Sequence, residues 1–105
     1  MSADKIIAEW KRHLPPEVPW SDVLVVLKAK FTSVDMKGGG SHVRVFDSRL
    51  KTFQEVAGPD TGRTPGVLQG RFAVPTLKGR KVKKVYVERI LDLLEIVEFM
   101  NQKGL

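Results

Sequence analysis

The chain has 105 residues, a length typical of one domain, and its composition of 42% hydrophobic and 29% charged residues fits a globular protein rather than a disordered one. No apolar run approaches the roughly 18 residues of a membrane span, the N-terminal residues lack the apolar core of a signal peptide, and the absence of cysteine excludes disulfides, thiolate nucleophiles and zinc knuckles. The only two histidines are far apart in the sequence, which argues against a metal site. Together these features lead us to expect a cytoplasmic protein without a metal or another cofactor.

The charge is positive and unevenly distributed. Eighteen Lys and Arg residues against twelve Asp and Glu residues give a net charge of +6. Residues 76–86 contain no acid and hold five cations, which are Lys78, Arg80, Lys81, Lys83 and Lys84. Such a patch favours nucleic acid or another polyanion as a partner over the alternative of an ordinary solvated surface.

The first third of the chain predicts two helices. Residues 3–14 place apolar side chains at helical spacing, and Pro15 and Pro16 end the pattern. A short rigid connector follows. Ser21 is a suitable N-cap for a second helix over 21–30, although its Val-rich sequence also fits a buried strand.

The remainder predicts three strands and a long helix. Strands are expected at 31–37, at 42–46 after the glycine turn 38–40, and at 70–74. A broad apolar face predicts a helix over 83–103, with Gly104 just beyond its end. Residues 47–66 leave two alternatives. They either prolong the preceding strand or form a short helix that Asp47 caps, Gly58 closes and Leu50, Phe53 and Val56 anchor.

These elements predict an α+β fold of two layers, in which a three-stranded antiparallel sheet carries helices on one face. Residues 1–20 form an extra N-terminal helix with its Pro-rich connector. Residues 21–105 form the α-β-β-β-α core, and the whole chain is one domain.

The strand at 42–46 supplies the first candidate for chemistry. Because successive side chains in a strand point to opposite faces, Val43 and Val45 share one face, and His42, Arg44 and Phe46 share the other. If the valines meet the helices, then His42 stands on the uncovered face. A solvated surface histidine is the alternative.

The sequence around His42 resembles the HicA family of toxin mRNA interferases. The Gly40-Ser41-His42 tripeptide is similar to the family's motif between its first two strands. Residues 71–75, Arg-Phe-Ala-Val-Pro, resemble its third strand, and residues 83–91 resemble its Lys-rich start of the final helix. The similarity covers 21–95 in separate blocks. The N-terminal helix, the long segment between the second and third strands and the extra turn glycines depart from the family pattern.

This resemblance implies a fold like that of double-stranded-RNA-binding domains, an endoribonuclease activity that depends on His42, and neutralisation by a HicB-type antitoxin. Ser41, Lys37 and Arg44 are expected to support His42, and Arg71 joins the five cations of 76–86 as an RNA-binding residue.

The chemistry is consistent with that expectation. RNA carries its own nucleophile, the 2′-hydroxyl, and an imidazole ordinarily titrates near pH 6.5, about where a general base is useful. The second proton-transfer group stays open between Lys37, Ser41, a more distant residue and water. Two other interpretations also stay open: a non-catalytic RNA-binding module, and a protein-interaction domain that uses Trp10, Trp20 and the long insertion.

Overall fold

The computed structural model describes residues 2–36, 42–58, 62–76 and 80–104. Within these ranges the protein is an α+β fold with four helices and two small antiparallel sheets. The helices are α1 (Ala3–Arg12), α2 (Trp20–Lys30), α3 (Ser48–Ala57) and α4 (Lys84–Gln102). The main sheet consists of β2 (Ser33–Asp35), β3 (His42–Phe46) and β4 (Arg71–Pro75), and a second pair joins β1 (Glu17–Pro19) to β5 (Lys81–Lys83).

The main sheet has the expected three antiparallel strands, in the order β2-β3-β4. Val45 of β3 is the central residue of one row, paired with Val34 on β2 and with Phe72 on β4. Burial alternates along β3 and β4, so that Val43, Val45, Phe72 and Val74 are buried while the residues between them are not. The face predicted to be apolar is therefore the buried one.

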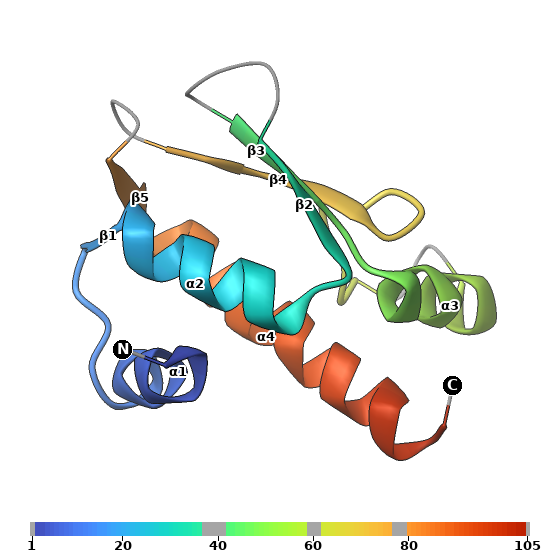
Figure 1. Ribbon diagram of the computed structural model, residues 1–105. Coiled ribbons are helices and arrows are strands. Elements are labelled where there is room, and N and C mark those ends of the chain that lie inside the picture. The colour runs from blue at the N-terminus through green and yellow to red at the C-terminus, as the bar shows by residue number, and fades with distance from the viewer. Residues whose placement is uncertain (1, 37–41, 59–61, 77–79, 105) are drawn as a thin grey trace.

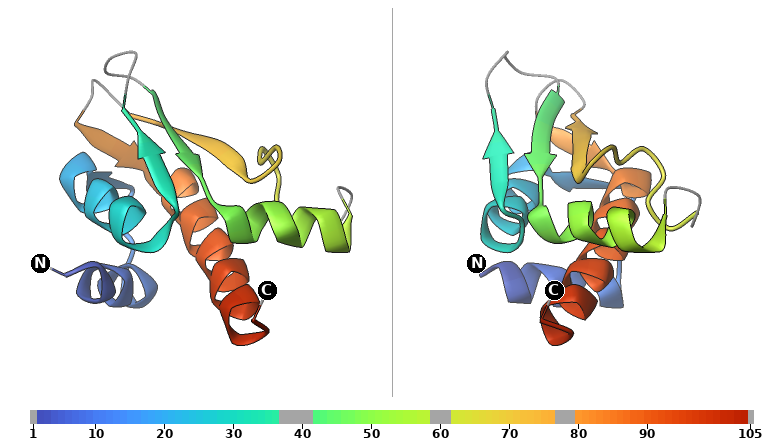
Figure 2. Two further views of the ribbon diagram at one scale, coloured as in Figure 1. Left: turned by 45° about the vertical axis from the view of Figure 1, so that its right-hand side comes forward. Right: turned by 90° about the vertical axis from the view of Figure 1, so that its right-hand side faces the viewer.

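Helices α2 and α4 lie against this buried face, as Figure 1 shows. They contribute the centre of the hydrophobic core, including Val23, Leu27, Ile90 and Leu93. Helix α1 lies on the side of α2 that faces away from the sheet (Figure 2) and adds Ile6 and Trp10 to the same core. The predicted helix was too long at its end, because the chain is already extended at His13.

Residues 17–19 form a strand that the sequence did not predict. The connector pairs with β5 through Val18 opposite Val82, and both valines are buried. This pair also caps the neighbouring helices. The Trp20 N–H donates to the Arg80 carbonyl at 2.8 Å, and the Lys84 N–H donates to the Pro16 carbonyl at 2.9 Å. Helix α2 therefore begins one residue before Ser21, and no side chain caps it.

Helix α3 decides between the two alternatives for residues 47–66. Asp47 is its N-cap and accepts hydrogen bonds from the Arg49 and Leu50 amides, while Gly58 closes it with a φ of +86°. Leu50 and Phe53 are buried as expected, but the prediction for Val56 was wrong, since 74% of it is exposed. The helix extends beyond the end of the sheet (Figure 1), and its buried residues, Leu50 and Phe53, lie in its first two turns.

The last helix matches its prediction closely. It starts one residue later than expected, and Gly104 lies just past its end with a φ of +72°. Val85 was assigned to the apolar face, but this prediction was wrong, since 54% of it is exposed.

Candidate functional site

The uncovered side of the main sheet carries the first group of predicted site residues. We call this surface the open face; it consists of Ser33, Asp35, His42, Arg44, Phe46, Arg71, Ala73 and Pro75. The strand register arranges most of them in rows across the sheet. Ser33, Phe46 and Arg71 form one row, and Asp35, Arg44 and Ala73 form the next.

His42 is the first residue of β3 and is exposed. It lies opposite Pro75, the last residue of β4. The β-strand alternation places its side chain on the same face as Arg44, two residues along the strand. The structure therefore brings together the histidine and one of its three proposed supporting residues. The other two, Lys37 and Ser41, lie outside the described residues, as does Lys78.

Two guanidinium groups stand on the open face, from Arg44 and Arg71. The Arg71 group lies over the ring of Phe46, 4.9 Å from the ring centroid, so that a cation covers an aromatic ring at the end of the sheet away from His42. For Arg44, the part of the chain that the structure describes supplies no hydrogen bond or ion pair. Its charge is available to an anionic ligand.

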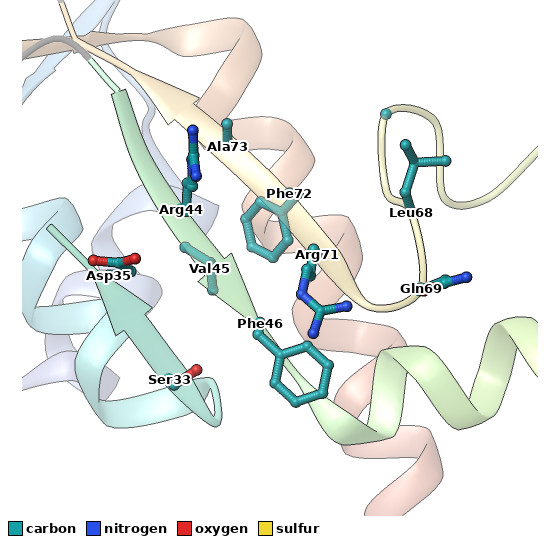
Figure 3. Close-up of a pocket in the computed structure, with 11 residues that line it drawn as sticks. Ser33, Asp35, Arg44, Val45, Phe46, Leu68, Gln69, Arg71, Phe72 and Ala73 are labelled. Carbon is teal, nitrogen blue, oxygen red and sulfur yellow. The ribbon is translucent and has the colours of Figure 1, made fainter. Parts of the chain in front are cut away.

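These side chains line an open concavity of about 870 Å³. Figure 3 shows Asp35 and Ser33 on one side of it, Arg44 and Phe46 at its centre, and Leu68 and Gln69 on the turn that leads into β4. Its composition is mixed, with an aromatic ring, two cations and one carboxylate. A concave surface of this kind suits a ligand that combines a flat ring with negative charge.

The second group of predicted site residues lies on β5 and the start of α4. Arg80, Lys81, Lys83 and Lys84 are all exposed, while Val82 between them is buried. The Lys81 ammonium lies 3.9 Å from the Glu17 carboxylate, which offsets part of this charge. The first amide of α4 donates to the Pro16 carbonyl, so this N–H is already used and is not open to an anion.

The two groups are connected through β4. Pro75 ends β4 beside His42, and Arg80 follows it by five residues. At no more than about 3.6 Å per residue, the Arg80 and Pro75 Cα atoms lie within roughly 18 Å of each other. The basic residues of β5 are therefore at the His42 end of the sheet, as Figure 1 also shows for the strand itself.

Sequence reasoning missed five residues that line the concavity. It did not assign Ser33, Asp35, Leu68 or Gln69 to the site, and it gave Phe46 a face but no role. The cross-strand register and the turn before β4 bring them together, and neither is visible in a single strand's alternation. In the described ranges, no group of three or more His, Asp or Glu side chains is placed to hold a metal ion.

Comparisons with known protein families, with curated proteins and with solved structures found no match to this chain. Across the ranges with described coordinates, no helix has the length and apolarity needed to cross a membrane.

Proposed function

We propose that this protein is an endoribonuclease that cleaves mRNA without a metal ion, with His42 as the general base. The observation that supports this most strongly is the placement of an exposed histidine on an uncovered sheet face that also carries two arginines. The resemblance to HicA toxins supplies the rest of the proposal. It implies a fold related to double-stranded-RNA-binding domains, a role as the toxin of a toxin-antitoxin pair in the cytoplasm, and a HicB-type antitoxin as the protein partner.

The proposed reaction uses the nucleophile that RNA itself provides. The His42 imidazole accepts the proton of a 2′-hydroxyl, and the 2′-oxygen attacks the adjacent phosphorus. The bond from phosphorus to the 5′-oxygen breaks, and a proton donor protonates the departing oxygen. The products are a 2′,3′-cyclic phosphate and a 5′-hydroxyl. The pentacovalent transition state carries extra negative charge, which a nearby cation stabilises.

Arg44 is the described cation best placed for that task. It lies two positions from His42 on the same face of β3, or about 7 Å along the strand. Arg80, Lys81, Lys83 and Lys84 would hold phosphates farther along the strand of RNA. Such contacts position the RNA without reading its sequence.

The open face adds one candidate for the second proton transfer. Asp35 is paired with Arg44 across the sheet and is therefore a diagonal neighbour of His42. A carboxyl group in this position can orient the imidazole or pass on a proton, and it joins Lys37 and Ser41 as a candidate.

A cleavage assay on unstructured RNA in EDTA tests the proposal. His42→Ala should reduce the rate by at least about 100-fold, the low end of general acid–base contributions. His13→Ala removes the other histidine, which is also exposed, and should leave the rate unchanged. Both variants should keep their stability within about 0.5 kcal/mol.

Two further observations separate the alternatives: the chemical groups at the ends of the RNA products, and whether RNA binds when it is not cleaved. A 2′,3′-cyclic phosphate end supports attack by the 2′-oxygen, while loss of activity in EDTA contradicts the metal-free mechanism. Binding of RNA without cleavage by the wild type identifies a non-catalytic RNA-binding module. If the wild type neither binds nor cleaves RNA, the proposal is wrong and a protein-interaction domain is the better interpretation.

A further inference from the structure

The turn that leads into β4 gives the open face a rim. Leu68 and Arg71 exchange two backbone hydrogen bonds, each of 2.9 Å, around a two-residue turn. Both turn residues have positive φ, +52° at Gln69 and +79° at Gly70, as in a type I′ hairpin. Glutamine is an unusual residue in this conformation, since Asn and Gly dominate such positions.

The Gln54 side chain on α3 and the backbone N–H of Asp47 hold this turn in place. The Gln54 side-chain amide accepts a hydrogen bond from the Gly70 N–H at 2.9 Å and donates to the Val67 carbonyl at 2.9 Å. The Asp47 N–H donates to the Gly70 carbonyl at 3.0 Å. The turn is therefore fixed on both sides, and Leu68 is presented to solvent with 78% of its surface exposed.

The sheet and the turn both line the concavity of about 870 Å³, with the sheet as its floor and the turn as its rim. Its floor includes the Phe46 ring with the Arg71 guanidinium 4.9 Å from the ring centroid. Figure 3 shows these two groups side by side, with Leu68 and Gln69 on the adjacent turn. A flat aromatic and a flat cation in contact are the surface on which proteins stack unpaired bases.

We propose that this concavity binds one unpaired base of an RNA strand, stacked on the Arg71 guanidinium, which in turn lies over the Phe46 ring. Leu68 and Gln69 on the turn cover one edge of the base, and the polar groups of Ser33 and Asp35 on β2 face the opposite edge. This inference rests on the proposed function, because it places the base on the RNA that His42 cleaves.

The distance along β3 relates the base to the cleavage position. Phe46 is four residues from His42, or about 13 Å along the strand. The stacked base therefore belongs to a nucleotide close to the scissile phosphate and not to a remote part of the RNA. Cleavage should consequently show a preference for base identity at one position near the cut and little preference farther away.

A set of short unstructured RNAs, each with one 2-aminopurine at a different position, tests the inference. His42→Ala protein is titrated so that the RNA stays intact. We expect the 2-aminopurine fluorescence to be quenched at one position, or at two adjacent ones, and to be unaffected elsewhere. Phe46→Leu and Arg71→Lys, each added to His42→Ala, should abolish this quenching and weaken RNA binding about 10-fold.

The controls separate stacking from folding and from charge. Arg71→Lys keeps the positive charge at an exposed position, so it remains informative even if Phe46→Leu disturbs the sheet. Phe99→Leu removes a different exposed ring that also has a cation over it, Lys103 at 5.8 Å, and should change neither quenching nor affinity.

The possible results distinguish this inference from the proposed function. If RNA binds and is cleaved by the wild type but no position is selectively quenched, the base site is wrong and the nuclease proposal stands. Quenching that survives both Phe46→Leu and Arg71→Lys likewise contradicts the site. If no RNA binds at all, both proposals are wrong.

Discussion

Asp47 and Arg49, two residues apart, form a two-point ion pair at the end of the sheet away from His42. The Arg49 Nε donates to one carboxylate oxygen at 3.0 Å, and a terminal nitrogen donates to the other at 2.7 Å. The carboxylate is fully buried and also accepts from the Thr32 amide, while Arg49 donates to the Lys30 carbonyl and to Asn101. This one pair joins the ends of α2 and α4 to the start of β2 and to α3.

Asp47→Asn should destabilise the protein by about 3 kcal/mol. Breaking a buried ion pair typically costs about 3–5 kcal/mol, and the lower end applies because about a quarter of the Arg49 side chain, 24%, is exposed to water. Urea unfolding at neutral pH measures the loss. Asp92→Asn, an exposed acid on α4, should change the stability by less than about 0.5 kcal/mol. Equal effects at the two positions would contradict the importance of the buried pair.

The same pair predicts how stability responds to acid. Burial alone would raise the pKa of Asp47, but the hydrogen bonds and charge of Arg49, with the Thr32 amide, outweigh burial and hold the pKa below its ordinary value. The contribution of ionised Asp47 to the free energy of unfolding is therefore fully present above the unfolded pKa of about 3.9. It is lost as the pH falls through the lower pKa of the folded state. The difference in urea midpoint between wild type and Asp47→Asn should narrow below about pH 4. A constant difference down to pH 2 would contradict the lowered pKa.

Gly70→Ala should be strongly destabilising. A Cβ at this position would lie 2.6 Å from the Asp47 carbonyl oxygen and 3.0 Å from the Lys51 amide nitrogen, both of which are backbone atoms. The positive φ adds about 1–2 kcal/mol for a residue with a side chain. Gly62→Ala is the matched control, since its φ is +73° and a Cβ there would meet no atom within 4 Å beyond its own chain neighbours.

The two glycine variants together isolate the steric term. Gly62→Ala should reduce the free energy of unfolding only by the cost of the positive φ. Gly70→Ala should reduce it by at least about 2 kcal/mol more, measured by thermal or urea unfolding. The turn before β4 would also shift, so the quenching of a base analogue should weaken in Gly70→Ala alone. Similar stability losses in both variants would mean that the chain relaxes around Gly70.

Helix α1 should unfold together with the rest of the protein. Ile6 is only 2% exposed and belongs to the same core as α2 and α4, so Ile6→Ala should cost about 3 kcal/mol. Ile7 is partly buried, and Ile7→Ala should cost less. Unfolding followed by far-UV circular dichroism and by tryptophan fluorescence should give coincident curves. A separate early loss of helix signal would show that residues 1–20 form an independent unit.

How far the sequence predicted this structure depends on the range of the interaction involved. Local signals were sufficient for the alternation of β3, for the apolar face of α4 and for Asp47 as a possible cap. Nothing local indicated the pairing of residues 17–19 with 81–83. Each of these three-residue strands has a single buried valine, and one of the two is bounded by proline. Their pairing depends on contacts between residues that are more than 60 positions apart.

In the candidate site, too, local patterns predicted some features, while others depend on contacts between distant residues. The alternation of β3 predicted that His42, Arg44 and Phe46 share a face, and their burial pattern confirms it. The contact of Phe46 with Arg71 depends on the register between β3 and β4, which one strand's pattern does not specify. The turn at Gln69 was unpredictable for a different reason. Its positive φ is imposed by the contacts of Gly70 with Gln54 and Asp47, and glutamine carries no local preference for it.

The final prediction concerns the cations of β5 and α4 and rests on the proposed RNA substrate. Lys83 and Lys84 are exposed at the junction of these two elements. Each single-stranded RNA phosphate that is neutralised contributes about −0.7 to the slope of log K against log salt. Replacing both lysines with alanine should therefore flatten the slope by roughly 1.4 and weaken binding about equally on unrelated RNA sequences.

The matched control for this double variant is Lys5→Ala with Lys11→Ala. These two lysines are also exposed, and replacing them removes the same charge. They lie on α1, on the side of α2 away from the sheet (Figure 2). We expect their replacement to leave the slope nearly unchanged, because long-range effects are screened beyond about 10 Å at 0.1 M salt. Filter binding or fluorescence anisotropy across a salt series measures both variants. If the two double variants flatten the slope equally, then RNA responds to the net charge of the protein, and β5 with the start of α4 is not a phosphate-binding surface.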